Sequence, residues 1–218
     1  MENMIKMTKS KVNIDILEEK TTKEKIFEAA IDLFAKKGFD ATAMREIAEE
    51  VGIKKASLYS HYKSKNEIMD NIFKYFKEEL MKMRPPEAKN LEKMDNITPE
   101  IFRQRANLTL GIFKNPKMEK IFRIISGEQF RDKRAKLIIL ECLIHEPYSF
   151  SRTVLEIMAN KGIINKIDPE VKAMEFQYSI FTLFMEYLLL KSDNSDTGKI
   201  EGMIEKHLNY FVNSLKKK

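Results

Sequence analysis

The stretch around Gly52 places two short amphipathic segments, 42–51 and 55–61, on either side of one glycine. Leu58 is the main apolar residue of the second segment. The inward residues of the first are Met44, Ile47, Ala48 and Val51. Gly52 permits the positive φ that a tight turn requires, and two short helices joined in this way form a helix-turn-helix. The alternative, a short loop between two core helices, would not explain why the second segment shows so much polar and aromatic surface.

Helix-capping patterns on both sides of this motif predict its neighbours. Two capping boxes place Glu three residues after a hydroxyl side chain: Thr21 with Glu24, and Ser64 with Glu67. The first opens a helix that Gly38 is expected to end, and the second starts the helix that follows the motif. Thr42 is expected to cap the first short helix of the motif. Pro85-Pro86 would end the helix that begins after Ser64.

The formal charge of +6 does not by itself indicate nucleic-acid binding. Residues 21–80 contain eleven Lys or Arg and eleven Asp or Glu, so this region is neutral overall. Within it, however, residues 51–66 contain four lysines and no acid. A charge run alone is most often a solvated face, but on a helix-turn-helix it favours contact with DNA phosphates.

The second short helix is therefore a candidate recognition helix, which would lie in the major groove of DNA. The side chains expected at phosphates are Lys54, Lys63, Lys65, Tyr59 and His61. Those expected at base edges are Lys55, Ala56 and Ser57, because lysine can donate to guanine and alanine can touch a thymine methyl. For His61, an ordinary surface histidine is an equally good reading.

The stretch TTKEKIFEAAIDLFAKKGFDATAMREIAEEVGIKKASLYSHYKSKNEIM resembles the DNA-binding domain of the TetR family of transcriptional regulators. The resemblance covers about fifty residues and rests on the motifs LF..KGF..T, IA...G and LY.HY.SK. It implies a three-helix DNA-binding domain and a larger all-helical ligand domain. It also implies a homodimer that usually represses transcription and is released by a small molecule.

By position in these motifs, the residues that would touch DNA are Arg45, Lys55, Ser57, Tyr59, His61 and Lys65. Thr42, just before the second helix, is counted with them. Two positions depart from the family pattern. Ala43 stands where Thr or Ser often contacts phosphate, and Lys54 stands where Ser or Thr commonly caps the recognition helix.

Seven glycines, six prolines and the lack of alternating strand patterns indicate an all-α chain. We expect an N-terminal extension (1–20), a helix-turn-helix DNA-binding domain (21–66) and a helical ligand-binding and dimerisation domain (67–218). A linker is expected at 84–97. The helices expected after it are 98–113, 115–130, 132–145, 148–160, 168–191 and 197–215. Pro147 is expected to close the third of these helices.

The helix expected at 168–191 is apolar on nearly every side, so it should be buried all round. The last helix has one apolar stripe: Ile200, Met203, Ile204, Leu208, Phe211 and Leu215. Two such helices from each of two chains would form a four-helix interface, which predicts a homodimer. A large monomeric core is the alternative.

A small-molecule pocket is expected in the larger domain. Its predicted residues are Phe76, Phe102, Arg105, Phe122, Gln129, Phe176 and Tyr178. Glu175, Ser179, Thr182 and Glu186 form a polar line that would be a packing seam or part of this pocket. On the helix expected at 132–145, one face should be exposed to solvent: Arg134, Ile138, Glu141 and His145.

Other classes of protein receive little support. The single Cys142 excludes an internal disulfide and a cysteine metal cluster, and it fits a reducing cytosol. The longest apolar stretch, 180–190, is too short for a bilayer, and no signal-peptide core is present, so we expect a cytoplasmic protein. No HExxH, P-loop or GxGxxG motif occurs, so neither an enzyme nor a cofactor is expected.

The predicted function is a DNA-binding transcriptional regulator, most simply a repressor. It would be released from a palindromic operator by a small apolar or aromatic effector. The alternative is a helical small-molecule-binding protein, or an activator or co-regulator that does not act by effector-released repression.

Overall fold

The computed structural model describes residues 20–82 and 97–217. The expected extension at 1–20, apart from Lys20, lies outside these residues, as do Pro85-Pro86 and nearly all of the expected linker. Within the described ranges the chain is helical, with one isolated bridge between Ile164 and Lys216 in place of any sheet. The prediction of an all-α fold is confirmed.

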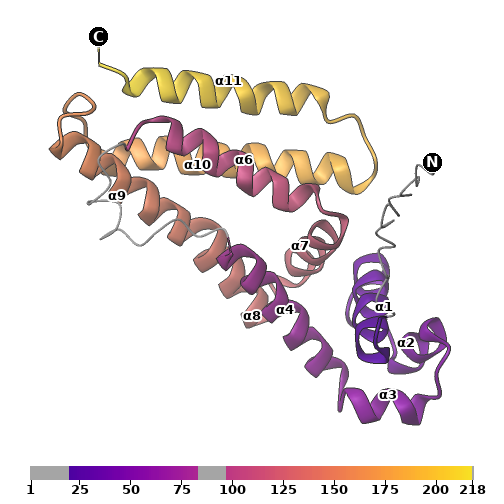
Figure 1. The fold of residues 1–218 in the computed structure, drawn as a ribbon. Coiled ribbons are helices and arrows are strands. Elements are labelled where there is room, and N and C mark those ends of the chain that lie inside the picture. The colour runs from indigo at the N-terminus through magenta and orange to yellow at the C-terminus, as the bar shows by residue number, and fades with distance from the viewer. Residues whose placement is uncertain (1–19, 83–96, 218) are drawn as a thin grey trace, which may run out of the picture.

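The first three helices gather at one end of the molecule (Figure 1). They are α1 (Thr22–Lys37), α2 (Met44–Val51) and α3 (Lys55–His61). The capping box at Thr21 is present, and Gly38 and Gly52 end α1 and α2 with φ of 87° and 74°. A positive φ is strained for residues with a Cβ, which explains glycine at both helix ends. The predicted helix-turn-helix is therefore the observed one.

The cap of α2 differs from the prediction. Ala43, not Thr42, is the N-cap, and the Glu46 carboxylate accepts a hydrogen bond from the Ala43 N–H at 2.9 Å. The Thr42 hydroxyl instead donates to the Gly38 carbonyl at 2.9 Å, and the residue is only 1% exposed. Thr42 therefore ties the start of α2 to the end of α1.

Helix α4 (Lys65–Met81) leads away from the first three helices into the larger bundle (Figure 1). Ser64 caps it by accepting from the Glu67 N–H at 3.2 Å, as the sequence predicts. The Glu67 carboxylate accepts from the Lys63 N–H, one residue before the cap. The buried face of α4 consists of Ile68, Met69, Ile72, Phe73 and Phe76. The division expected at residue 66 falls within this continuous helix.

The larger bundle contains helices α6 (Glu100–Lys114), α7 (Pro116–Glu128), α10 (Pro169–Ser192) and α11 (Gly198–Leu215). Helices α6, α10 and α11 pack side by side (Figure 1). An aromatic cluster joins them, in which the rings of Phe102, Phe176 and Phe211 have centroids 4.5–5.1 Å apart. The starts and ends of these helices lie within a few residues of the predicted ones.

The region from 133 to 160 departs most from prediction. Here α8 (Lys133–Leu137), the π-helix η1 (Ile138–His145) and α9 (Glu146–Asn160) follow one another without a break, since the junction residues keep helical dihedrals. Pro147 therefore does not close a helix; it lies in the first turn of α9. The prediction of an exposed face is wrong for Ile138, which is 3% exposed, because the π-helix changes the register of side chains.

Ion pairs join α1 and α4 to the larger bundle. Lys117 and Lys120 of α7 contact Glu28 and Asp32 of α1 at 3.1 and 2.6 Å. Arg134 of α8 contacts Asp70 of α4 at 2.6 Å. Both the first helix and the fourth are thus held against the bundle. None of the described helices has both the length and the apolar character needed to cross a membrane.

Candidate functional site

The second helix of the motif, α3, has one buried anchor. Leu58 is fully buried, whereas the residues around it face solvent. The exposed residues of this segment are Lys54, Lys55, Ala56, Ser57, Tyr59 and Ser60. A short helix with one anchoring residue and an otherwise exposed surface has the geometry of a recognition helix.

The neighbouring predicted contact residues lie as follows. Lys63 is exposed, His61 is half-buried, and Arg45 on α2 is exposed within 3.3 Å of Glu49. Lys55 reaches over the ring of Tyr59 at 5.8 Å. Apart from the buried Thr42 and the engaged Lys65, the predicted residues are therefore exposed to solvent, His61 only in part.

Lys65 is placed differently. Its ammonium group donates to the carbonyls of Phe39, Asp40 and Thr42 at 2.6, 3.3 and 2.8 Å. It also lies 4.3 Å from the centre of the Phe39 ring. An ammonium group has three protons, so these carbonyls use all of its donors. The geometry gives Lys65 the task of holding the loop before α2 rather than that of a phosphate anchor. This role could not be predicted from the sequence, because the carbonyls belong to residues 23 to 26 positions before Lys65.

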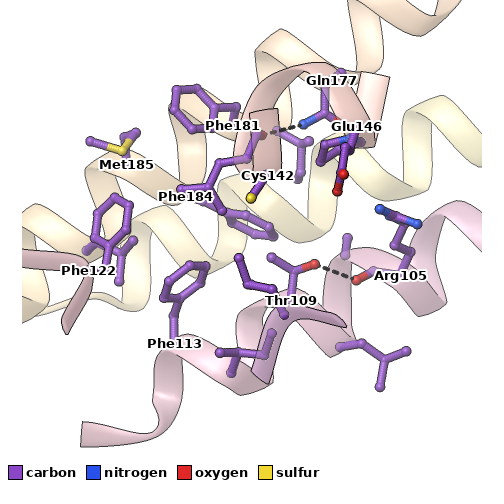
Figure 2. Close-up of a pocket in the computed structure, with 18 of the residues that line it drawn as sticks. Arg105, Thr109, Phe113, Phe122, Cys142, Glu146, Gln177, Phe181, Phe184 and Met185 are labelled. Carbon is purple, nitrogen blue, oxygen red and sulfur yellow. Dashed lines mark hydrogen bonds between the residues drawn. The ribbon is translucent and has the colours of Figure 1, made fainter. Parts of the chain in front are cut away.

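A second candidate site is a cavity of about 110 Å³ in the larger bundle. Its walls come from the end of α4 and from α6, α7, η1, the start of α9, and α10. Its lining residues include Leu80, Arg105, Phe113, Cys142, Gln177 and Phe184. Figure 2 shows Arg105, Glu146 and Gln177 toward one end, and Phe122 and Met185 toward the other.

Of the predicted pocket residues, three line this cavity: Arg105, Phe122 and Phe176. The other four do not. Phe76 is fully buried against Phe113, and Phe102 belongs to the aromatic cluster. Gln129 donates to the Ser126 carbonyl, and Tyr178 is exposed on α10. Of the polar line on α10, none of the four members borders the cavity; Gln177, which was not predicted, does.

Polar groups at the cavity are held by specific contacts. The Arg105 guanidinium stacks on the Phe150 ring at 4.1 Å. The Thr109 hydroxyl donates to the Arg105 carbonyl at 3.0 Å, which leaves its oxygen able to accept (Figure 2). Gln177, 7% exposed, donates its amide to the Leu143 carbonyl at 3.5 Å. Across the described residues, no cluster of three or more His, Cys, Asp or Glu could hold a metal ion.

Comparison with known proteins gives matches to regulators. Residues 26–77 match the family described as "Bacterial regulatory proteins, tetR family". The chain is 50% identical over 58 residues to the negative transcriptional regulator IcaR of Staphylococcus epidermidis, covering 25% of this chain and 31% of IcaR. It is 48% identical over 54 residues to the HTH-type regulator YerO of Bacillus subtilis, covering 25% of this chain and 19% of YerO. The matched segment thus spans less than a third of these relatives.

Solved structures match over nearly the whole chain. The SmeT–triclosan complex superposes with a TM-score of 0.64 at 16% identity, covering 91% of this chain and 93% of SmeT. The ketosteroid transcriptional regulator KstR2 of Mycobacterium tuberculosis superposes with a TM-score of 0.63 at 17% identity, covering 92% and 98%. At these identities the likeness concerns the fold. The relatives and neighbours are regulators rather than enzymes, in agreement with the prediction from the sequence.

Proposed function

Since the chain belongs to the TetR family of transcriptional regulators, we propose that it represses transcription by binding a palindromic operator as a homodimer. A small molecule in the cavity releases it. One observation carries this proposal. Helix α4 begins four residues after α3 ends, and its last turns, with Lys77, Leu80 and Met81, form a wall of the cavity. A single helix thus joins the recognition helix to the effector site.

The proposed DNA contacts are Arg45, Lys54, Lys55, Ala56, Ser57, Tyr59, His61 and Lys63. They are supported by their exposure, which is partial for His61, and, for the residues from 54 to 63, by the absence of acids between 51 and 66. Thr42 and Lys65 leave this set and become the residues that fix the start of α2. In this scheme Lys54 and Lys63 bind phosphates and the first turn of α3 reads bases.

The proposed dimer uses α10 and α11. Both helices bury one face in the bundle and still expose large apolar residues, as expected of a surface that a second copy covers. These residues are Val171, Met174, Tyr178, Leu189, Met203 and Tyr210. A twofold dimer presents two copies of α3, so the operator should contain two half-sites related by a dyad.

The proposed effector is a small apolar or aromatic molecule. The cavity, at about 110 Å³, has room for roughly one aromatic ring as it stands. Its aromatic rings are those of Phe113, Phe122, Phe176, Phe181 and Phe184, and its donors include Arg105 and Gln177. A molecule with an apolar body and one polar or acidic group fits both ends. Its insertion beside Leu80 would displace α4 and with it α3.

Selection of bound duplexes from a randomised pool, followed by footprinting, tests the DNA proposal. The expected result is a palindromic site protected on both half-sites by one dimer. A single protected half-site with one protomer bound would contradict the proposed dimer, and equal affinity for all duplexes would contradict a sequence-specific regulator.

A thermal-shift screen of aromatic acids, amides and amines tests the effector proposal. Hits should raise the melting temperature and weaken binding to the selected operator, and the operator should weaken binding of the hits by the same factor. Hits that stabilise the protein and leave operator affinity unchanged would instead support a helical small-molecule-binding protein.

A further inference from the structure

The π-helix η1 is part of the cavity wall. Cys142 and Leu143 of η1 line the cavity, followed by Glu146 and Pro147 at the start of α9. A π-helix has i→i+5 hydrogen bonds, and the Glu146 N–H accordingly donates to the Glu141 carbonyl. Such segments are rare, usually short, and frequent at functional sites. In this chain the π-helix is eight residues long and lies between two α-helices of one continuous rod.

Two residues favour the π register over the α register in this segment. In an α-helix the Leu143 carbonyl would accept from residue 147, but Pro147 has no N–H. Gln177 of α10 donates its amide to this carbonyl instead, at 3.5 Å. Because Gln177 also borders the cavity, an occupant that takes up its amide removes this support from η1.

At its other end, η1 continues into α8, which carries Arg134. The Arg134 guanidinium contacts Asp70 at 2.6 Å and Asn66 at 3.3 Å, both on the first turns of α4. It lies 5.4 Å from the centre of the Phe73 ring, also on α4. Asp132 holds the guanidinium from the α8 side, and this contact lowers the pKa of the Asp132 carboxyl. Arg134 thus reaches the part of α4 that directly follows α3.

We propose that Arg134 is the positioning residue through which the cavity controls α3: the register of η1 sets the rotation of α8, and the contacts of Arg134 with Asp70 and Asn66 pass that rotation to α4. This inference rests on the proposed function and adds a second route to it. The first route runs through Leu80 at the far end of α4, and the second acts next to α3.

The size of the movement supports this route. A change of register by one residue turns a helix by about 100° and shifts it by about 1.5 Å. A guanidinium that bridges two side chains at 2.6 and 3.3 Å does not keep both contacts through such a turn. Since Arg134 sits only four residues before η1, little of the rotation is lost before it reaches α4.

The single cysteine provides a test that needs no knowledge of the effector. Cys142 lies on η1 and borders the cavity, so a methanethiosulfonate reagent fills the cavity at a known atom. The full-length protein is labelled with the benzyl reagent, or with the methyl reagent as a smaller control, and complete labelling is verified by mass. Affinity for the selected operator is then measured before and after labelling, with Cys142→Ser as the variant that cannot be labelled.

The comparison is made in four backgrounds. Arg134→Gln and Asp70→Asn each remove one side of the Arg134–Asp70 ion pair. Arg134→Lys keeps the positive charge but not the planar guanidinium. Arg103→Gln is the matched control. Arg103 also joins two helices through two carboxylates and an amide, at Glu100, Glu205 and Asn209, but it does so between α6 and α11, away from α4.

We expect benzyl labelling to weaken operator binding about tenfold in the wild type and in Arg103→Gln, and the methyl label to have a smaller effect. In Arg134→Gln and Asp70→Asn the effect of labelling should fall to a minor fraction, with an intermediate value for Arg134→Lys. Equal weakening in the wild type, Arg134→Gln and Asp70→Asn would overturn the role of Arg134 and leave the effector mechanism to α4 alone. If labelling leaves operator affinity unchanged in the wild type, the proposed function itself fails.

Discussion

Lysines in and after α3 fall into two groups that the charge pattern alone does not separate. Lys54 and Lys63 extend into solvent, whereas the ammonium group of Lys65 is used by three carbonyls of the preceding loop. Substitution of a lysine should therefore have a different effect in each group. Under the proposed function, removing a solvent-facing lysine should remove a phosphate contact, whereas removing Lys65 should release the start of α2.

Lys63→Ala should lower the slope of log affinity against log salt by roughly one, because one phosphate contact is lost. Lys65→Ala should weaken operator binding with a slope close to that of the wild type, and it should lower the urea midpoint of unfolding. Salt titrations of both variants check this. A fall of the slope in Lys65→Ala equal to that in Lys63→Ala would show that Lys65 binds a phosphate after all.

Lys55→Ala should change which sequences are preferred. Its exposed position in the first turn of α3 suits a base contact, so its loss should weaken binding to the selected operator by about tenfold or more. Binding to unrelated duplexes should change much less. Competition with both kinds of DNA measures the ratio, and equal losses on both would identify Lys55 as another phosphate contact.

His207 should make stability depend on pH. Burial lowers the pKa of His207, and a hydrogen bond with the Phe176 backbone offsets part of this effect. Below about pH 6.5 the unfolded state therefore takes up a proton before the folded state does, so the free energy of unfolding falls as the pH falls. The wild type should lose more stability than His207→Gln between pH 7.5 and 5.5, measured by urea unfolding. Parallel losses in the two proteins would rule out this contribution.

Helices with explicit end signals could be read from the sequence. The capping box at Thr21, the glycines at 38 and 52 and the Asp168-Pro169 start mark the observed boundaries because each signal acts within a few residues. The π-helix could not be read in this way. A proline usually ends a helix. Here the Leu143 carbonyl, which Pro147 leaves without a backbone donor, accepts a hydrogen bond from Gln177 of α10.

The residues that line the cavity could not be predicted from local sequence patterns either. Periodicity shows that Phe76 and Phe102 are buried, but it does not show which buried residues border unfilled space. That depends on how α4, α6, α7, α10 and the continuous η1–α9 segment meet around the cavity. The exposed surface of α3 was predictable because it depends on one short helix with one anchor, Leu58.

Leu58→Ala tests how far α3 depends on this anchor. The side chain is fully buried, so its truncation should destabilise the protein by about 2–5 kcal/mol and abolish operator binding. Tyr59→Ala, at the exposed neighbouring position, should reduce operator binding with a much smaller effect on stability. Calorimetry measures the stability of both variants, and a binding titration measures their affinity for the operator. Normal operator binding by a folded Leu58→Ala protein would exclude α3 as the recognition helix.

The helix-turn-helix lies at one end of α4 and the cavity at the other, and ion pairs at α1 and at the start of α4 hold the two parts together (Figure 1). In a twofold dimer through α10 and α11, any rotation of α4 changes the distance between the two copies of α3. Operator binding requires that distance to match the spacing of major grooves, about 34 Å per helical turn.

The distance between the two copies of α3 is therefore the measurement that tests the account most directly. A spin label at Ser60→Cys in a Cys142→Ser background reports it by pulsed electron resonance, since Ser60 is exposed on α3. With operator bound, we expect one narrow distance distribution, and with a ligand from the thermal-shift screen, a distribution displaced from it. A distribution that stays unchanged when a ligand fills the cavity and operator affinity falls would contradict the claim that the cavity acts by moving the recognition helices.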